Sequence, residues 1–396
     1  MLLLSLSAPA CSGGSERPPP FNPFGGGAGS EDIGGAPSVD EPCEPIPEVD
    51  DEHACDSETV NVQLRKPTLY FVLDTSGSML EQVVSGSETK LKAAQNALRT
   101  VVEEVGHRIN YGMATFPGPA LSEYDQYNSD TVLGCEAGEE VFEIQAGDEA
   151  TCLNQPAQGP VYRSFDRVLS KLRPEGKTPL APTLDALSSS LLRREGRATI
   201  VLLTDGHPNC GQDAACSAED CPLTSLYLEC TEEFNCCSDE DASEVVSNPS
   251  SYCIDGEGST EQVKQLAEAG VDTYVIGLLG ETDFDDVMNS LAEAGGHARD
   301  GERKYYDADG LDELTDVVRR IGVSVAQSCS IELEDRPEYA SSLNVYFDGQ
   351  VVPYDADEGW TLSDQEVTLH GESCDAVVTG LVTQIRLISG CETIIR

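Results

Sequence analysis

The sequence has few basic residues and few of the side chains that enzymes most often use for acid–base chemistry. Of its 396 residues only 24 are Lys or Arg, against 71 Asp or Glu, so the formal net charge is -47. Five histidines are scattered along the chain, and no G-x-S-x-G, H-E-x-x-H or P-loop motif occurs. Because so acidic a surface repels nucleic acid and anionic lipid, neither is expected as a direct partner. The composition also argues against an enzyme.

Long hydrophobic runs are missing as well, and no segment approaches the length of a membrane-spanning helix. Residues 1–10 form a short apolar run followed by small residues, and Cys11 comes next, before Ser-Gly-Gly-Ser. This stretch resembles the end of a bacterial lipoprotein signal, although it lacks a positive start and its apolar core is short. We therefore expect 1–10 to be a signal remnant and Cys11 to carry lipid. The alternative is a plain secretory signal cut after Ala10.

Residues 11–60 are rich in Gly, Pro, Ser, Asp and Glu and contain few large apolar side chains. Such a segment cannot bury enough surface to offset its chain entropy, so the sequence predicts a disordered, lipid-anchored stalk. The protein would then be exported to the cell envelope or outer membrane, on the surface or in the periplasm. It would contact the membrane through its lipid anchor only.

Cysteine is abundant, with 15 residues, and this number indicates an oxidising compartment and a chain held by disulfides. Without Cys11 the remaining number is even. Proximity in sequence suggests three local pairs: Cys43 with Cys55, Cys135 with Cys152, and Cys374 with Cys391. The insertion at 207–258 holds seven cysteines and the segment beyond Val325 holds three. Both numbers are odd, so if every cysteine is paired, at least one in each region forms a disulfide with a cysteine outside that region. A zinc site on Cys210, Cys216 and Cys221 is a weaker alternative, because no C-x-x-C pair occurs.

The segment Leu69–Leu73 is an uninterrupted apolar run, which is typical of a strand buried on both faces. Asp74, Ser76 and Ser78 follow it in a D-x-S-x-S loop. In open α/β sheets, ligands bind at the carboxyl ends of the strands. One carboxylate and two hydroxyls in a tight loop suit a hard divalent cation, although Ser and Asp also serve as helix caps.

Two later segments carry matching chemistry. Thr178 lies in a Gly-Lys-Thr-Pro loop before a helical pattern, and Asp205 follows a second apolar run, 197–203. The order D-x-S-x-S, Thr, Asp resembles the von Willebrand factor type A domain and its metal-ion-dependent adhesion site. The resemblance implies that Ser76, Ser78 and Thr178 are direct metal ligands. It implies that Asp74 and Asp205 act directly or through water, with Mg²⁺, or Mn²⁺ or Ca²⁺, as the cation. Lys177 departs from the second Gly often found in this loop.

Alternating apolar runs and helical patterns predict an α/β fold with a doubly wound, mostly parallel sheet, Rossmann-like as in type A domains. This domain is expected over 65–327, with cysteine-bearing insertions at 118–160 and 207–258. In its first helix, 91–105, the apolar stripe should face the sheet, with Lys90 and Lys92 outside. The longer insertion leaves the end of a metal-bearing strand and should therefore cover the site.

Beyond Val325 the hydrophobic period changes to two, which predicts a small β domain over 328–396. Asp348 and Gly349 mark a hairpin turn between two strands. Two acidic segments, 239–244 and 307–310, are weak calcium candidates; a solvated loop and a helix cap, respectively, are favoured.

These observations favour a non-enzymatic protein that binds a partner through the metal. A cation held mostly by neutral hydroxyls keeps positive charge, so the ligand expected is a protein that presents an acidic residue. The alternatives are a structural envelope component with a stabilising metal and a non-catalytic subunit of a larger assembly. Asp74 and Asp205 could in principle serve hydrolysis, but metal binding already explains both.

Overall fold

The computed structural model describes residues 43–45, 60–61, 66–84, 86–119, 134–152, 158–193, 198–205, 208–211, 217, 221, 230–231, 233–244, 248–278, 284–326, 329–334, 342–378, 381–382, 384–389 and 393–395. The chain divides into two compact units. One contains Asp32–Pro45 and Arg65–Ser328, and the other contains Met1–Glu31, Ile46–Leu64 and Cys329–Arg396. Each is described by itself.

The first unit is built on a six-stranded sheet in the order β4-β3-β2-β5-β6-β7. Its strands are β2 (Thr68–Asp74), β3 (Asn110–Phe116), β4 (Glu139–Ala146), β5 (Ala198–Thr204), β6 (Asp272–Gly277) and β7 (Tyr306–Asp307). Neighbouring strands are parallel except for β4, which runs antiparallel to β3 at the edge. The structure confirms the predicted mostly parallel sheet.

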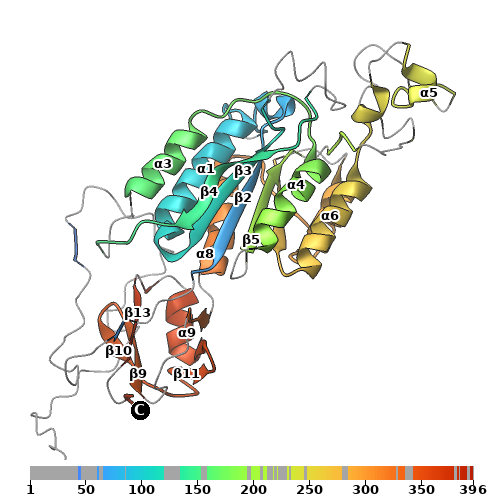
Figure 1. Ribbon diagram of the computed structural model, residues 1–396. Coiled ribbons are helices and arrows are strands. Elements are labelled where there is room, and N and C mark those ends of the chain that lie inside the picture. The colour runs from blue at the N-terminus through green and yellow to red at the C-terminus, as the bar shows by residue number, and fades with distance from the viewer. Residues whose placement is uncertain are drawn as a thin grey trace, which may run out of the picture. The chain divides into compact units, whose positions relative to one another are not determined.

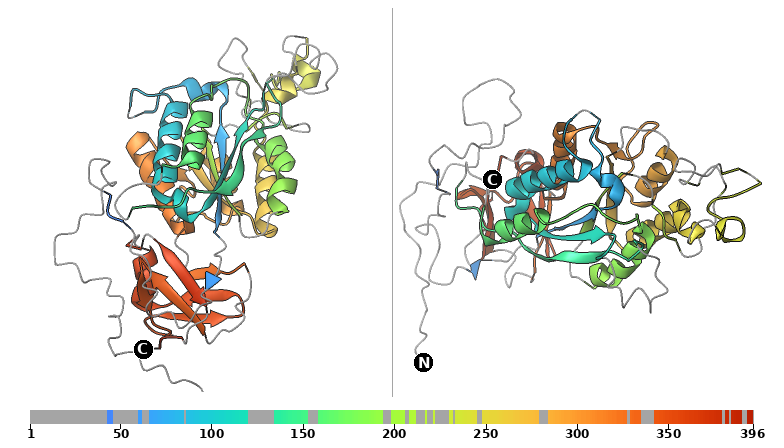
Figure 2. Two further views of the ribbon diagram at one scale, coloured as in Figure 1. Left: turned by 60° about the vertical axis from the view of Figure 1, so that its left-hand side comes forward. Right: turned by 90° about the horizontal axis from the view of Figure 1, so that it is seen from above.

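Helices cover both faces of this sheet. They are α1 (Lys90–Val105), α3 (Pro160–Leu169), α4 (Leu180–Leu192), α6 (Gly256–Glu268), α7 (Asp285–Ala294) and α8 (Leu311–Ala326). Figure 1 shows α1 and α3 on one side of the strands and α4 and α6 on the other, and the views in Figure 2 agree. Helix α6 begins at Gly256 because the Asp255 side chain accepts a hydrogen bond from Gly258 N (3.2 Å) and caps it.

Strand β2 lies at the centre of the sheet, and its side chains supply both hydrophobic cores. Leu69, Phe71 and Leu73 pack with α1, α3 and α8, whereas Tyr70 and Val72 pack with α4, α6 and α7. All five are fully buried. Because successive side chains of a strand point to opposite faces, an unbroken apolar run is what a central strand between two helical layers requires.

Short helical elements lie in the connecting segments and in the longer insertion. They are η2 (Gly77–Leu80), η3 (Gly106–Arg108), α5 (Asp239–Ala242) and η5 (Pro249–Tyr252). Across the described residues, no helix is long and apolar enough to cross a membrane.

The second unit contains two small antiparallel sheets and one helix. The first sheet has the order β1-β13-β9-β10, and the second has the order β11-β12-β8. Its elements are β1 (Val60–Asn61), β8 (Ser330–Glu332), β9 (Leu343–Phe347), β10 (Gln350–Val352), β11 (Trp360–Ser363), β12 (Glu366–Leu369), α9 (Gly371–Val378) and β13 (Ile385–Ser389).

The hairpin predicted in the second unit is present. Asp348 and Gly349 have φ values of 46° and 81° and join β9 to β10, as a tight two-residue turn requires. Helix α9 was not predicted, and Val60, at the end of the expected stalk, begins β1, which pairs with β13. Most of the stalk, with Cys11, lies outside the described residues.

The disulfides differ from the three local pairs expected. Cys43 is joined to Cys152 and Cys135 to Cys210, so neither Cys43–Cys55 nor Cys135–Cys152 forms. Cys329 is joined to Cys374, which excludes Cys374–Cys391. Sequence proximity was a poor guide because pairing depends on which Cα atoms folding brings within about 4.4–6.8 Å. Within the insertion, Cys221 pairs with Cys237 and Cys230 with Cys236. Cys210 forms its disulfide with a cysteine outside the insertion. The odd number of cysteines in the insertion requires at least one such bond if all are paired.

Candidate metal centre

The candidate site lies where two neighbouring parallel strands end. Leu73 of β2 pairs with Leu203 of β5, so the residues that follow each of them lie side by side at the carboxyl edge. Asp74 is fully buried and Asp205 is 2% exposed. Because parallel strands end at the same edge, the structure brings together two carboxylates that are far apart in sequence.

Hydroxyl groups of the D-x-S-x-S loop extend this pair of carboxylates. The Ser78 hydroxyl donates to Asp205 Oδ1 at 2.9 Å, and Ser76 Oγ lies 3.0 Å from Ser78 Oγ. In an octahedral site with Mg–O bonds of about 2.0–2.1 Å, neighbouring ligand oxygens are about 2.9 Å apart. Both distances match the spacing of neighbouring ligand oxygens in such a site, and the three oxygens are the hard donors that a small divalent cation prefers.

Asp74 is held beneath this group by two hydrogen bonds. Its Oδ1 accepts from Ser76 N at 2.8 Å and its Oδ2 accepts from the Thr204 hydroxyl at 2.6 Å. Burial raises the pKa of the Asp74 carboxyl to about 7, and the charge of Asp205 adds to the rise. Two buried carboxylates whose charges repel one another are the environment in which a cation favours the ionised forms of both.

The loop that carries Thr178 is bonded to the D-x-S-x-S loop through its backbone. Gly77 N donates to Gly176 O at 3.1 Å, and Glu175 N donates to Thr75 O at 2.8 Å. Thr178 is 4% exposed, and Asn209 holds its backbone on both sides. Thr178 N donates to Asn209 Oδ1 and Asn209 N donates to Thr178 O, both at 2.9 Å. Thr178 thus belongs to the same edge as the other candidate ligands, and Asn209 is a supporting residue that the sequence did not reveal.

Lys90 does not lie outside, as the helical pattern predicted. Its side chain is only 10% exposed, and its ammonium group lies 3.1 Å from Asp205 Oδ2 and 2.9 Å from Glu81 Oε2. The prediction was wrong because Lys90 is the first residue of α1. This end of the helix lies against the candidate site and not in solvent. Burial opposes the charged form of Lys90, but the charges and hydrogen bonds of Asp205 and Glu81 together outweigh it, and the pKa of the lysine is raised.

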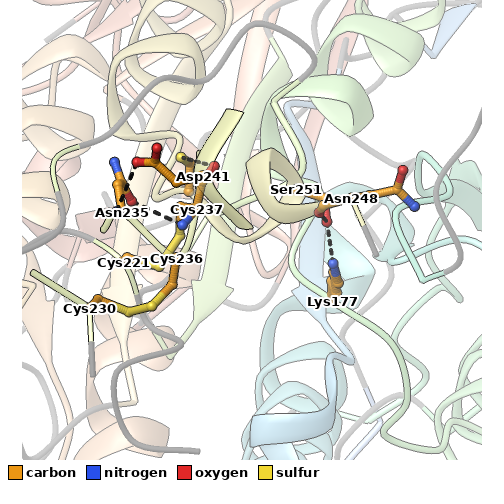
Figure 3. Close-up of a disulfide and its surroundings, with 10 residues drawn as sticks. Lys177, Cys221, Cys230, Asn235, Cys236, Cys237, Asp241, Asn248 and Ser251 are labelled. Carbon is orange, nitrogen blue, oxygen red and sulfur yellow. Dashed lines mark hydrogen bonds between the residues drawn. A yellow bond between two sulfur atoms is a disulfide. The ribbon is translucent and has the colours of Figure 1, made fainter. Parts of the chain in front are cut away.

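Described residues of the cysteine-rich insertion contact the loop that carries Thr178. The Lys177 ammonium donates to the Ser251 hydroxyl (Figure 3). It also lies 3.3 Å from the centroid of the Tyr252 ring. Cys210 N donates to Ser251 O at 3.2 Å, which joins the start of the insertion to η5 near its end. Burial lowers the pKa of Lys177 to about 8. Lys177 therefore connects the loop that carries Thr178 to the insertion.

The other metal candidates are not supported. Cys210 and Cys221 are in disulfides, so they cannot act as zinc thiolates. The described residues hold no group of three or more His, Cys, Asp or Glu side chains that could bind a metal ion. A metal centre among the described residues would therefore need ligands other than these side chains, and the group at the sheet edge supplies hydroxyl oxygens beside two carboxylates.

The sequence is similar to known proteins over part of its length. Residues 69–207 match the family model of the von Willebrand factor type A domain. The uncharacterized protein YwmD of Bacillus subtilis (strain 168) is 24% identical over 206 residues, which is 52% of this chain and 75% of YwmD. YwmC of the same organism is 28% identical over 151 residues, which is 38% of this chain and 58% of YwmC.

Among solved structures, the PilB minor pilin from Streptococcus sanguinis is similar with a TM-score of 0.42 and 17% identity, covering 67% of this chain and 62% of that one. The chain thus spans less than two thirds of the pilin. The family match contains β2 with its D-x-S-x-S loop, the Thr178 loop and β5 with Asp205. Over these residues the chain is similar to the von Willebrand factor type A domain.

Proposed function

We propose that this protein is an exported binding protein that holds a divalent cation, Mg²⁺ or Mn²⁺, at the edge formed by Asp74, Ser76, Ser78, Thr178 and Asp205. The cation recognises an acidic residue on a partner protein. One observation carries the proposal: three side-chain oxygens of the site already stand 2.9 and 3.0 Å apart, as neighbouring Mg²⁺ ligands do. Hydroxyl ligands are neutral, so the bound cation keeps charge for an anionic ligand.

Exposed apolar side chains beside the site support a protein ligand. Leu80 ends η2, two residues after Ser78, and is 64% exposed, and Val84 in the same loop is 66% exposed. Exposed apolar side chains close in sequence to a polar site offer apolar surface to a bound protein. A partner with an acidic side chain flanked by apolar residues fits both features.

The disulfides support export. Five are formed between described cysteines, and they include bonds that join distant parts of the chain, such as Cys43 with Cys152. Such bonds persist in oxidising compartments. Attachment through a lipid on Cys11 remains a prediction from the sequence. A non-enzymatic role also fits the site, because its two carboxylates are engaged by neighbouring hydroxyl, amide and ammonium groups.

The first test is calorimetric titration of the oxidised full chain with Mg²⁺ and Mn²⁺. We expect one site in the native protein and at least about tenfold weaker binding in Ser76→Ala and Ser78→Ala, because each change removes a direct ligand. The matched control is Ser87→Ala, an exposed serine in the loop before α1. Native chain that binds neither cation would contradict the proposal.

A second measurement tests the open coordination position. Bound Mn²⁺ speeds the relaxation of water protons only while it holds exchanging water. Acetate, as a minimal carboxylate ligand, should therefore lower the relaxation rate of the loaded protein, whereas chloride at the same ionic strength should not. If acetate has no effect although Mn²⁺ binds, the metal stabilises the loops without receiving a ligand, and the structural alternative is the better account.

A further inference from the structure

Lys90 brings a buried positive charge into the candidate metal centre. Its ammonium group lies 3.1 Å from Asp205 Oδ2, while Asp205 Oδ1 accepts a hydrogen bond from the Ser78 hydroxyl. One carboxylate therefore joins the lysine on one side to a candidate metal ligand on the other. The second partner of Lys90, Glu81, has a side chain that is 68% exposed and is screened by water.

Neither helix stability nor packing accounts for a lysine at this position. Lys90 is the first residue of α1, where the helix dipole disfavours cations, and the first turn of α1 contains no acidic residue. Burying an ammonium group also costs free energy unless it is paired. What compensates these costs is the contact with Asp205, which is itself buried, so the role of Lys90 has to be sought at the metal centre.

We propose that Lys90 is a fixed internal counter-ion of the metal centre. Its ammonium group weakens cation binding at Asp205 and leaves the loaded site with a surplus positive charge that attracts an acidic ligand. This inference rests on the proposed metal site, and it identifies a residue that sets cation affinity without being a ligand.

The charge balance gives the direction of each effect. A divalent cation together with ionised Asp74 and Asp205 has no net charge. Lys90 adds one positive charge, which the exposed Glu81 offsets only in part because water screens its carboxylate. The ammonium group contacts one oxygen of the Asp205 carboxylate, and the candidate cation position adjoins the other. Like charges this close repel strongly because the site is buried and the effective dielectric constant is low. The lysine therefore raises the dissociation constant for the cation, and it strengthens attraction of a carboxylate to whatever cation is bound.

The test compares Mg²⁺ binding by the full chain with that of Lys90→Gln. Glutamine can still donate a hydrogen bond to Asp205, so the change removes mainly the charge. We expect the dissociation constant to fall by about tenfold or more in this variant. Lys90→Arg keeps the charge and should stay within about twofold of the native protein. The matched control is Lys92→Gln, which removes an exposed lysine two residues further along α1 and should also change little.

Thermal unfolding with and without Mg²⁺ provides a second measurement that does not depend on a ligand. Without metal, Lys90→Gln should unfold at a lower temperature than the native chain, because Asp205 loses its cation. With saturating Mg²⁺ the difference should shrink or reverse. A role in packing alone would lower both temperatures alike and would overturn the inference.

The outcomes separate this inference from the proposed function. Native binding that Lys90→Gln leaves unchanged or weakens overturns the inference and leaves the metal site standing. Binding by Lys90→Gln but not by the native chain supports the inference and contradicts the proposed function, because Lys90 would then replace the metal. No binding by either protein overturns both.

Discussion

The central sheet and the cysteine-rich insertion hold their residues in place by different means. The sheet buries large apolar side chains on both faces, among them Phe71 and Leu203, which are fully buried. The insertion has a small cluster of its own, in which Cys221, Cys236, Cys237 and Cys253 are buried with Phe234 and Tyr252 packed against them. A short segment cannot bury enough apolar area to offset its chain entropy, so covalent bonds replace a core there.

The sheet and the insertion should therefore lose their structure in response to different changes. The sheet should respond to lost volume, and the insertion to lost disulfides. Between them lies the Thr178 loop, which is bonded to both, so its response shows which region positions the metal ligands.

The largest effect is expected from Phe71→Ala. Phe71 lies in the middle of β2, and its ring centroid is 6.0 Å from that of Phe165 on α3. Removing this ring leaves a cavity between sheet and helices, so the free energy of unfolding should fall by about 3–5 kcal/mol. Urea unfolding of the full chain measures the loss.

The control for Phe71→Ala is Phe234→Ala in the insertion. Phe234 is only partly buried, and the cysteine cluster around it is held by covalent bonds. We expect its effect on the unfolding of the sheet to stay below about 1 kcal/mol. If the two changes lowered the free energy of unfolding by similar amounts, the insertion and the sheet would form one cooperative core.

A smaller effect is expected from the double variant Cys135→Ser with Cys210→Ser. This disulfide closes a loop with a sequence separation of 75 and should contribute about 2–4 kcal/mol to stability. It also joins the two flanks of the Thr178 loop, because Lys177 N donates to Gly134 O and Asn209 holds Thr178. Mg²⁺ binding should therefore weaken several-fold, as calorimetry can measure. Unchanged affinity would show that the sheet alone positions Thr178.

Much of the fold and the candidate site follows from local sequence. The run Leu69–Leu73 predicts a central strand because both faces of such a strand are buried, and the structure confirms the mostly parallel sheet around it. Asp74, Ser76 and Ser78 are close in sequence, so their proximity needs no knowledge of tertiary structure. Thr178 and Asp205 were predicted only through the family resemblance, and metal binding by all five remains a prediction.

What the sequence did not reveal depends on contacts between distant segments. Helical periodicity indicates which face of α1 packs on the sheet, but it says nothing about the end of the helix, where Lys90 meets Asp205. Disulfide pairing depends on spatial distance, which is why Cys135 bonds to Cys210 rather than to nearby Cys152. Asn209 gives no signal in a loop without periodicity, since its role comes from hydrogen bonds to another loop.

The smallest effect on the sheet and metal centre is expected from Cys230→Ser with Cys236→Ser. This bond spans a sequence separation of only 6 and lies in the cysteine cluster of the insertion (Figure 3), so its loss should destabilise that segment alone. Mg²⁺ affinity and the urea midpoint of the sheet should match the native chain, while limited proteolysis should cleave the insertion faster. The contact of Lys177 with Ser251 and Tyr252 should persist in this variant, because the Cys221–Cys237 bond still holds the cluster against which Tyr252 packs. Weakened Mg²⁺ binding here would mean that the whole insertion, and not only its bond to Cys135, positions the metal loop.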